Sequence, residues 1–78
     1  MFKVKYFGMI AEVADCPEEN FSNAEAVMVN DLIALITEKY PRMADLSFKV
    51  ALNNRLAQAE DRLRERDEIA LLPPFAGG

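Results

Sequence analysis

The segment that most constrains the fold is residues 29–40, with the sequence VNDLIALITEKY. Its apolar side chains recur at helical spacing and form one stripe, made of Val29, Leu32, Ile33, Ile36 and Tyr40. We expect Asn30 to cap this helix and Asp31 to lie favourably at the positive end of its dipole. Pro41 should end it, because the residue before a proline is pushed out of the helical region. The pattern predicts an amphipathic helix that buries one face.

On the N-terminal side of this helix, the chain alternates with the period of a strand. Residues 2–7 place Phe2, Val4 and Tyr6 on one face, and the two lysines with Phe7 on the other. Residues 9–14 then repeat at helical spacing and predict a short helix. Residues 18–22 are a weak strand candidate, which we retain because the first strand needs a partner.

On the C-terminal side, residues 48–53 predict a further strand, and Asn53-Asn54 can take positive φ and turn into a short strand at residues 56–57. The charged segment that follows reads as a solvated turn with Leu63 as its apolar anchor. Residues 68–72 then predict the last strand.

The order of these elements favours an α+β domain, with one main helix packed across one face of a mixed sheet. Pro73-Pro74 cannot continue a sheet, since proline has no N–H to donate. We therefore expect a domain at residues 1–72 and an extended tail at residues 73–78.

Composition excludes several classes of function. The net charge of −4 disfavours nucleic acid, whose binding depends on Lys and Arg neutralising phosphates. The absence of histidine rules out Ser-His-Asp triads and His-ligated metal sites within this chain, and we expect no metal site. No run approaches the roughly 20 apolar residues that span a bilayer, and no signal peptide is evident, so we expect no membrane partner and a cytoplasmic location.

The lone cysteine, Cys16, invites a role in sulfur chemistry. It stands beside Asp15, Glu18 and Glu19, an acidic setting that disfavours a thiolate. One free thiol without a framework of cysteines suits a reducing compartment. We therefore interpret Cys16 as a quiet thiol.

The end of the chain carries the residues that suggest chemistry. It reads Pro73-Pro74-Phe75-Ala76-Gly77-Gly78, a stiff spacer and an aromatic before two glycines. Glycine has no Cβ, so this terminus is thin enough to enter a narrow channel. A bare carboxylate is inert until activated, and the usual activation is attack on ATP to give an acyl-adenylate, from which a thiol or persulfide displaces AMP.

This ending resembles the Pro-Pro-x-x-Gly-Gly terminus of the molybdopterin synthase small-subunit family, the MoaD family, within the MoaD/ThiS-like sulfur carriers. Residues 67–70 resemble the family's Asp-Glu-hydrophobic-Ala, and matches at residues 4–8, 31–33, 40–41 and 50–53 extend the resemblance over most of the chain. Two features depart from it. Arg66 stands in a turn where the family often carries glycine, so that turn must avoid positive φ or tolerate strain. Residues 22–28 are less regular than usual.

The resemblance implies a β-grasp, ubiquitin-like fold and a chain that binds no cofactor itself. An adenylyltransferase of the ubiquitin-activating type would use ATP to adenylate Gly78, and a desulfurase or rhodanese would supply sulfur for a thiocarboxylate. That group would deliver sulfur to precursor Z (cyclic pyranopterin monophosphate) inside the large subunit of molybdopterin synthase, a heterotetramer whose catalytic residues lie on that subunit.

The resemblance also assigns roles to individual residues. Residues 73–77 (Pro73, Pro74, Phe75, Ala76 and Gly77) would thread the partner's active site, and Phe7, Leu56 and Leu72 would dock the partners. Three alternatives stay open. The chain could be a thiamine-pathway sulfur carrier, although Pro73-Pro74 favours a molybdopterin synthase small subunit. It could be a ubiquitin-like modifier joined to proteins through Gly78, or an interaction domain with an inert tail.

Overall fold

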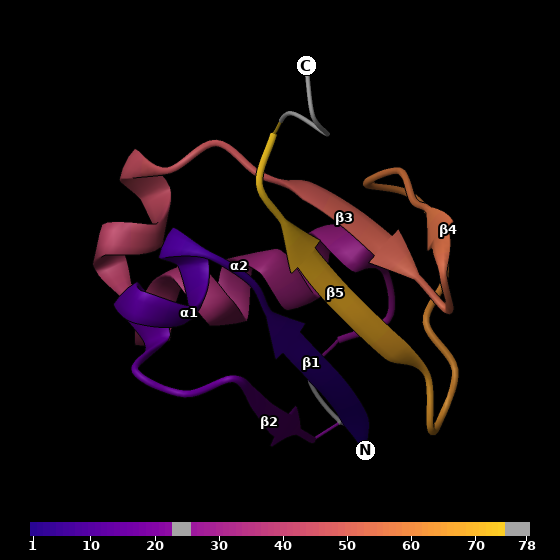
Figure 1. Ribbon diagram of the computed structural model, residues 1–78. Coiled ribbons are helices and arrows are strands. Elements are labelled where there is room, and N and C mark those ends of the chain that lie inside the picture. The colour runs from indigo at the N-terminus through magenta and orange to yellow at the C-terminus, as the bar shows by residue number, and fades with distance from the viewer. Residues whose placement is uncertain (23–25, 75–78) are drawn as a thin grey trace.

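The computed structural model describes residues 1–22 and 26–74, which form one mixed sheet with α2 across one of its faces (Figure 1). In chain order the elements are β1 (Phe2–Tyr6), α1 (Met9–Ala14), β2 (Glu18–Phe21), α2 (Val29–Lys39), the 3₁₀ helix η1 (Pro41–Asp45), β3 (Lys49–Leu52), β4 (Arg55–Leu56) and β5 (Glu68–Leu72). The predicted α+β architecture with one main helix is confirmed.

The sheet has the strand order β2-β1-β5-β3-β4. The first and last strands, β1 and β5, lie side by side at its centre and run parallel, whereas the other neighbouring pairs are antiparallel. A parallel pair cannot be joined by a tight turn. Everything between the two strands in sequence therefore makes the crossover and supplies the helix that covers the sheet.

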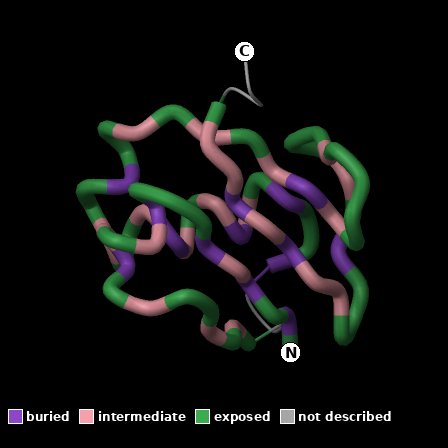
Figure 2. Tube along the Cα trace, in the orientation of Figure 1, coloured by how far each residue is buried: buried purple, intermediate pink, exposed green. Residues whose placement is uncertain are grey.

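The core lies between α2 and the face of the sheet that meets it. Along β1 and β5 the buried positions alternate with more exposed ones, as predicted from the sequence (Figure 2). Its largest fully buried side chains are Phe2, Val4, Leu32, Ile36, Met43, Ile69 and Leu71. Burying each such side chain stabilises the fold by roughly 1.5–3 kcal/mol, so the helical stripe and the alternating strands account for most of the cohesion.

The start of α2 differs from the sequence-based expectation. Asn30 does not cap the helix: α2 begins at Val29, and its N-cap is Met28, two residues before Asn30. The Asp31 carboxylate instead accepts hydrogen bonds from the backbone N–H groups of Val27 and Met28, each at 3.0 Å. This carboxylate satisfies two free donors at the positive end of the helix. At the other end α2 stops at Lys39, directly before Tyr40 and the predicted stop at Pro41.

Two turns, one between β3 and β4 and one before β5, use positive φ. Asn53 and Asn54 have φ values of 51° and 70°, as the sequence predicted. Arg66 has φ 72°, so this turn tolerates strain rather than avoiding it. The left-handed region costs a residue with a Cβ roughly 1–2 kcal/mol. Asp67 offsets this cost, because its carboxylate accepts hydrogen bonds from the Arg64 N–H at 2.6 Å and from Asn53 Nδ2 at 3.0 Å.

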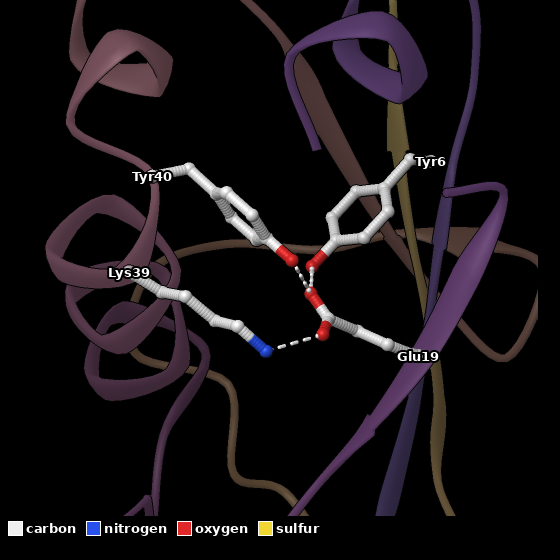
Figure 3. A network of polar contacts seen from close by, with 4 residues as sticks. All are labelled: Tyr6, Glu19, Lys39 and Tyr40. Atoms are coloured by element: carbon white, nitrogen blue, oxygen red, sulfur yellow. Dashed lines mark hydrogen bonds and ion pairs between the residues drawn. The ribbon is translucent and has the colours of Figure 1, made fainter. Parts of the chain in front are cut away.

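A carboxylate on the edge strand β2 ties three elements together (Figure 3). Glu19 Oε1 accepts hydrogen bonds from the hydroxyls of Tyr6 on β1, at 2.6 Å, and of Tyr40 at the end of α2, at 2.8 Å. Lys39 Nζ lies 2.6 Å from Glu19 Oε2. Lys39 Nζ also lies 5.5 Å from the centroids of the Phe21 and Tyr40 rings, within cation–π range.

The electrostatics of this group favour the ionised carboxylate. Burial by itself raises the pKa of Glu19, but hydrogen bonds from Lys39, Tyr6 and Tyr40 outweigh it and lower the pKa below its usual value. The pKa of Tyr6 is raised, first by burial and then by its bond to Glu19, and the same causes raise that of Tyr40. The group is therefore an anion held by three donors over the physiological range.

We expect Glu19→Gln to lower the free energy of unfolding by about 2 kcal/mol at pH 7, since hydrogen bonds to an ion are among the stronger ones. A lowered pKa in the folded state stabilises the fold above the pKa of the unfolded state, about 4.3 for glutamate, and this stabilisation is lost as the pH falls through the lowered value. The difference between wild type and variant should shrink in acid. Urea unfolding across a pH series measures it.

Glu18→Gln is the matched control, because Glu18 is the neighbouring glutamate on β2 and half-exposed, with its carboxylate 3.7 Å from Lys3 Nζ. Exposed pairs contribute about 0–1 kcal/mol. Equal losses for the two variants, or a Glu19→Gln loss that does not change in acid, would contradict this account.

Candidate functional site

The tail leaves the domain from the centre of the sheet, at the end of β5. Pro73 follows Leu72 directly and packs next to Gly8, which with Phe7 connects β1 to α1. Gly8 has φ 59° and ψ −135°, a conformation essentially restricted to glycine. A Cβ on Gly8 would lie 3.3 Å from Pro73 Cγ. The bare backbone at residue 8 therefore leaves room for the tail to pass.

A pocket of about 440 Å³ lies beside this crossing point. Its walls come from the β1–α1 turn, from the segment between η1 and β3, and from the first two residues of the tail; they are lined by Gly8, Met9, Ile10, Asp45, Leu46, Ser47, Pro73 and Pro74. The lining is mainly apolar, and Asp45 is the charged residue among those that form it. We call it the tail-root pocket.

The face of the sheet opposite α2 carries the three predicted docking residues. Phe7 is 43% exposed, Leu56 is 71% exposed, and Leu72 is partly exposed. The β1–β5 register, continued by one residue, places Phe7 beside Leu72. Leu56 lies opposite Ala51 on β3, which in turn lies opposite Ala70 on β5. The three side chains thus belong to one surface, which we call the open face.

Charged residues border the apolar part of the open face. Lys3 and Lys5 lie on β1, and Lys49 lies opposite Leu72 on β3. Lys5 Nζ is 3.4 Å from a carboxylate oxygen of Glu68, and both side chains are more than a third exposed. Such pairs contribute little to stability. The arrangement is typical of an interface, with an apolar centre and a charged rim.

The other predicted site residues fall in two groups. Pro73 and Pro74 form the start of the tail, whereas Phe75, Ala76, Gly77 and Gly78 lie outside the described residues. Within residues 1–22 and 26–74, no group of three or more His, Cys, Asp or Glu side chains could hold a metal ion. Over the same residues, the helices are too short or too polar to cross a bilayer.

Sequence reasoning missed the tail-root pocket and the role of Glu19. The sequence marked Gly8 only as a turn, and nothing in it places residues 45–47 against residues 73–74. Glu19 stood in the weakest predicted strand, and its tyrosine partners lie 13 and 21 residues away. The only hint in the sequence was that Glu19 shares the inward face of β2 with Phe21. That hint is too weak to identify the partners of Glu19.

The mixed sheet with α2 across one face, and a central last strand that leads into a Gly-Gly terminus, defines a ubiquitin-like β-grasp protein. Residues 4–78 match the model of the ThiS family, which is almost the whole chain. The chain therefore belongs to the ThiS family.

Two relatives resemble the chain over nearly its full length. A Mycobacterium tuberculosis protein named molybdopterin synthase sulfur carrier subunit is 35% identical over 78 residues, covering 96% of this chain and 94% of that protein. A Chlamydomonas reinhardtii protein of the same name is 32% identical over 80 residues, covering 97% and 96%. Both share the expected family, and the resemblance inferred from the sequence is confirmed.

Solved structures agree with the fold. A Pyrococcus furiosus protein provisionally described as subunit 1 of a molybdopterin converting factor superposes with a TM-score of 0.87 at 26% identity, covering 95% of this chain and 97% of that one. A Helicobacter pylori complex of subunits 1 and 2 of molybdopterin-converting factor gives 0.72 at 30% identity, covering 99% and 97%. Small archaeal modifier protein 1 from Methanosarcina acetivorans gives 0.82 at 29% identity, covering 99% and 95%.

We expect Gly8→Ala to lower the free energy of unfolding by about 1–3 kcal/mol, because an L-residue is strained at this φ and ψ and its Cβ crowds Pro73. Chemical denaturation measures the loss. A double-mutant cycle with Pro73→Ala separates the two causes, since removing the ring relieves the crowding but not the backbone strain. A Gly8→Ala variant as stable as wild type would contradict both.

Proposed function

We propose that this chain is the sulfur carrier subunit of a molybdopterin synthase and that its Gly78 carboxylate carries the sulfur. The observation that carries the proposal is the Pro73-Pro74-x-x-Gly77-Gly78 terminus at the end of the central strand of a ThiS-family domain. Two relatives at 32% and 35% identity bear the name molybdopterin synthase sulfur carrier subunit, which supports it.

The proposed chemistry takes place at the terminus. The Gly78 carboxylate attacks the α-phosphate of ATP in an adenylyltransferase partner, and pyrophosphate leaves. A persulfide of a desulfurase or rhodanese partner then displaces AMP, and a thiol cleaves the sulfur–sulfur bond, which leaves a thiocarboxylate on Gly78. The described chain contributes no catalytic side chain to these steps. Its part is to present a thin, nucleophilic end to the active sites of its partners.

The thiocarboxylate would then donate its sulfur to precursor Z in the large subunit, where water restores the carboxylate. A Helicobacter pylori complex pairs subunit 1 of a molybdopterin-converting factor with subunit 2, and one of its chains is 30% identical to this one, covering 99% of this chain and 97% of that one, which supports a large-subunit partner. The open face, with Phe7, Leu56 and Leu72, is the surface we assign to this contact. A cytoplasmic location belongs to the same proposal.

A second candidate function is protein modification through Gly78. It is favoured by the similarity to small archaeal modifier protein 1 of Methanosarcina acetivorans, at 29% identity and a TM-score of 0.82. Both functions begin with an activated C-terminal carboxylate and differ in the acceptor. Isopeptide adducts of Gly78 on lysines of other proteins would distinguish the modifier from the sulfur carrier.

We expect incubation with the cognate adenylyltransferase, ATP and a sulfur source to replace one oxygen of the Gly78 carboxylate by sulfur. Removing Gly78, or adding a residue after it, should abolish the conversion and leave the fold intact, because the tail lies beyond the core strand β5. Mass spectrometry of the C-terminal peptide measures the change, which avoids confusion with methionine oxidation. Conversion in a chain without Gly78 would refute the proposal.

We expect Phe7→Ala and Leu56→Ala to weaken the complex with the cognate large subunit by about 2 kcal/mol each, if they anchor the interface. Their exposure should keep the change in unfolding free energy near 0.5 kcal/mol. Calorimetric titration beside thermal unfolding separates the two effects. Val27→Ala is the control, because Val27 is 51% exposed and lies before α2, away from the open face. Unchanged affinity together with a large loss of stability would show that these residues belong to the core and do not anchor the interface.

A further inference from the structure

The tail-root pocket is an apolar hollow that the fold does not fill. Its volume of about 440 Å³ lies within the range of about 300–1,000 Å³ typical of ligand sites. Met9, on its wall, is 66% exposed. An exposed methionine beside a hollow is unusual for a structural side chain, and methionine adapts its shape to what packs on it. The pocket therefore has the size and the lining to receive one long side chain.

The position of the pocket identifies which molecule can reach it. Pro73 and Pro74 form part of its wall and are also the first two residues of the tail. On its other side, Gly8 follows Phe7 of the open face directly in the chain. A protein that docks on the open face and takes the tail into its active site would therefore lie next to residues of this pocket.

The charge at the pocket restricts the chemistry of its occupant. Asp45 is exposed, and within residues 1–22 and 26–74 its carboxylate makes no hydrogen bond or ion pair. A partner with only apolar groups here that also covered Asp45 would remove water from this carboxylate and leave it unpaired, which is strongly unfavourable. A basic side chain avoids that cost, because its apolar stem fits the apolar lining while its charged end reaches the carboxylate.

We propose that the tail-root pocket binds a basic side chain, an arginine by preference, of the protein that receives the tail. The planar guanidinium lies well on apolar surfaces and pairs with a carboxylate through two parallel hydrogen bonds, which an ammonium cannot do. This inference rests on the proposed function, since it concerns the partner of the same tail. It adds a second anchor that fixes the direction in which Pro73-Pro74 enters the partner.

The first test uses Asp45→Asn, which removes the charge and keeps the shape. With the cognate large subunit we expect a loss of affinity of about tenfold, mainly through faster dissociation, and a weaker dependence on salt. Glu60→Gln is the matched control, because Glu60 is an exposed carboxylate on the β4–β5 connection and does not line the pocket. Equal affinity for wild type and Asp45→Asn, or equal losses for both variants, overturns the inference.

The second test observes the pocket directly in the full chain. Methyl-labelled methionine gives one NMR signal for each of Met1, Met9, Met28 and Met43. On binding the large subunit, the Met9 methyl should shift strongly, whereas Met28 at the start of α2 and the buried Met43 should change little. If the Met9 methyl signal has the same chemical shift in the complex as in the free chain, the pocket is not occupied and the inference is overturned.

The two tests also separate this inference from the proposed function. If Gly78 forms a thiocarboxylate but Asp45→Asn binds the large subunit as tightly as wild type, the proposed sulfur-carrier function stands and the proposed basic anchor is refuted. If the wild-type chain forms neither a thiocarboxylate nor a complex with the large subunit, the proposed function is refuted, and so is the inference that depends on this partner.

Discussion

The parallel pairing of β1 with β5 is the constraint on which the rest of the structure depends. It joins the first and last strands of the domain, from Lys3 opposite Glu68 to Tyr6 opposite Leu71. Because parallel strands need a long crossover, the chain between them must leave the sheet and return, and α2 is placed across one face as a result. The same pairing puts the last strand, β5, at the centre of the sheet, where β1 and β3 hold it on both sides.

This central position fixes the point at which the tail leaves the domain. β5 is hydrogen-bonded to β1 and β3, and Ile69 and Leu71 are fully buried between the sheet and α2. The strand ends where Pro73 can no longer donate to the ladder. Since Gly8 meets Pro73 at this point, the turn after β1 and the exit of the tail form one structural unit. A partner that recognises this unit recognises the direction of the tail.

The edge strand β2 is stabilised in a different way from the central strands. β2 has four residues and pairs on one side only, with β1. An edge strand of this length gains little from hydrogen bonding alone. The Glu19 carboxylate compensates by joining β2 to Tyr6 on β1 and to the end of α2 through Lys39 and Tyr40. The side chain that holds the edge is thus ionised, partly buried and satisfied by three donors.

The sequence predicted the features that depend on local periodicity and failed where distant residues meet. Alternation identified the inward residues of β1 and β5, and helical spacing identified α2, because burial of one face imposes these periods directly. The capping side chain at the start of α2 was predicted to be Asn30, whereas the carboxylate of Asp31, in the first turn, accepts from the N–H groups of Val27 and Met28. Both side chains carry suitable oxygens, and only the folded geometry decides which one reaches these N–H groups. The tail-root pocket could not be predicted, because Asp45 and Pro73 become neighbours only after the crossover has closed. The chemistry expected at the terminus could be predicted from the sequence, whereas the surface around the start of the tail forms only when the chain has folded.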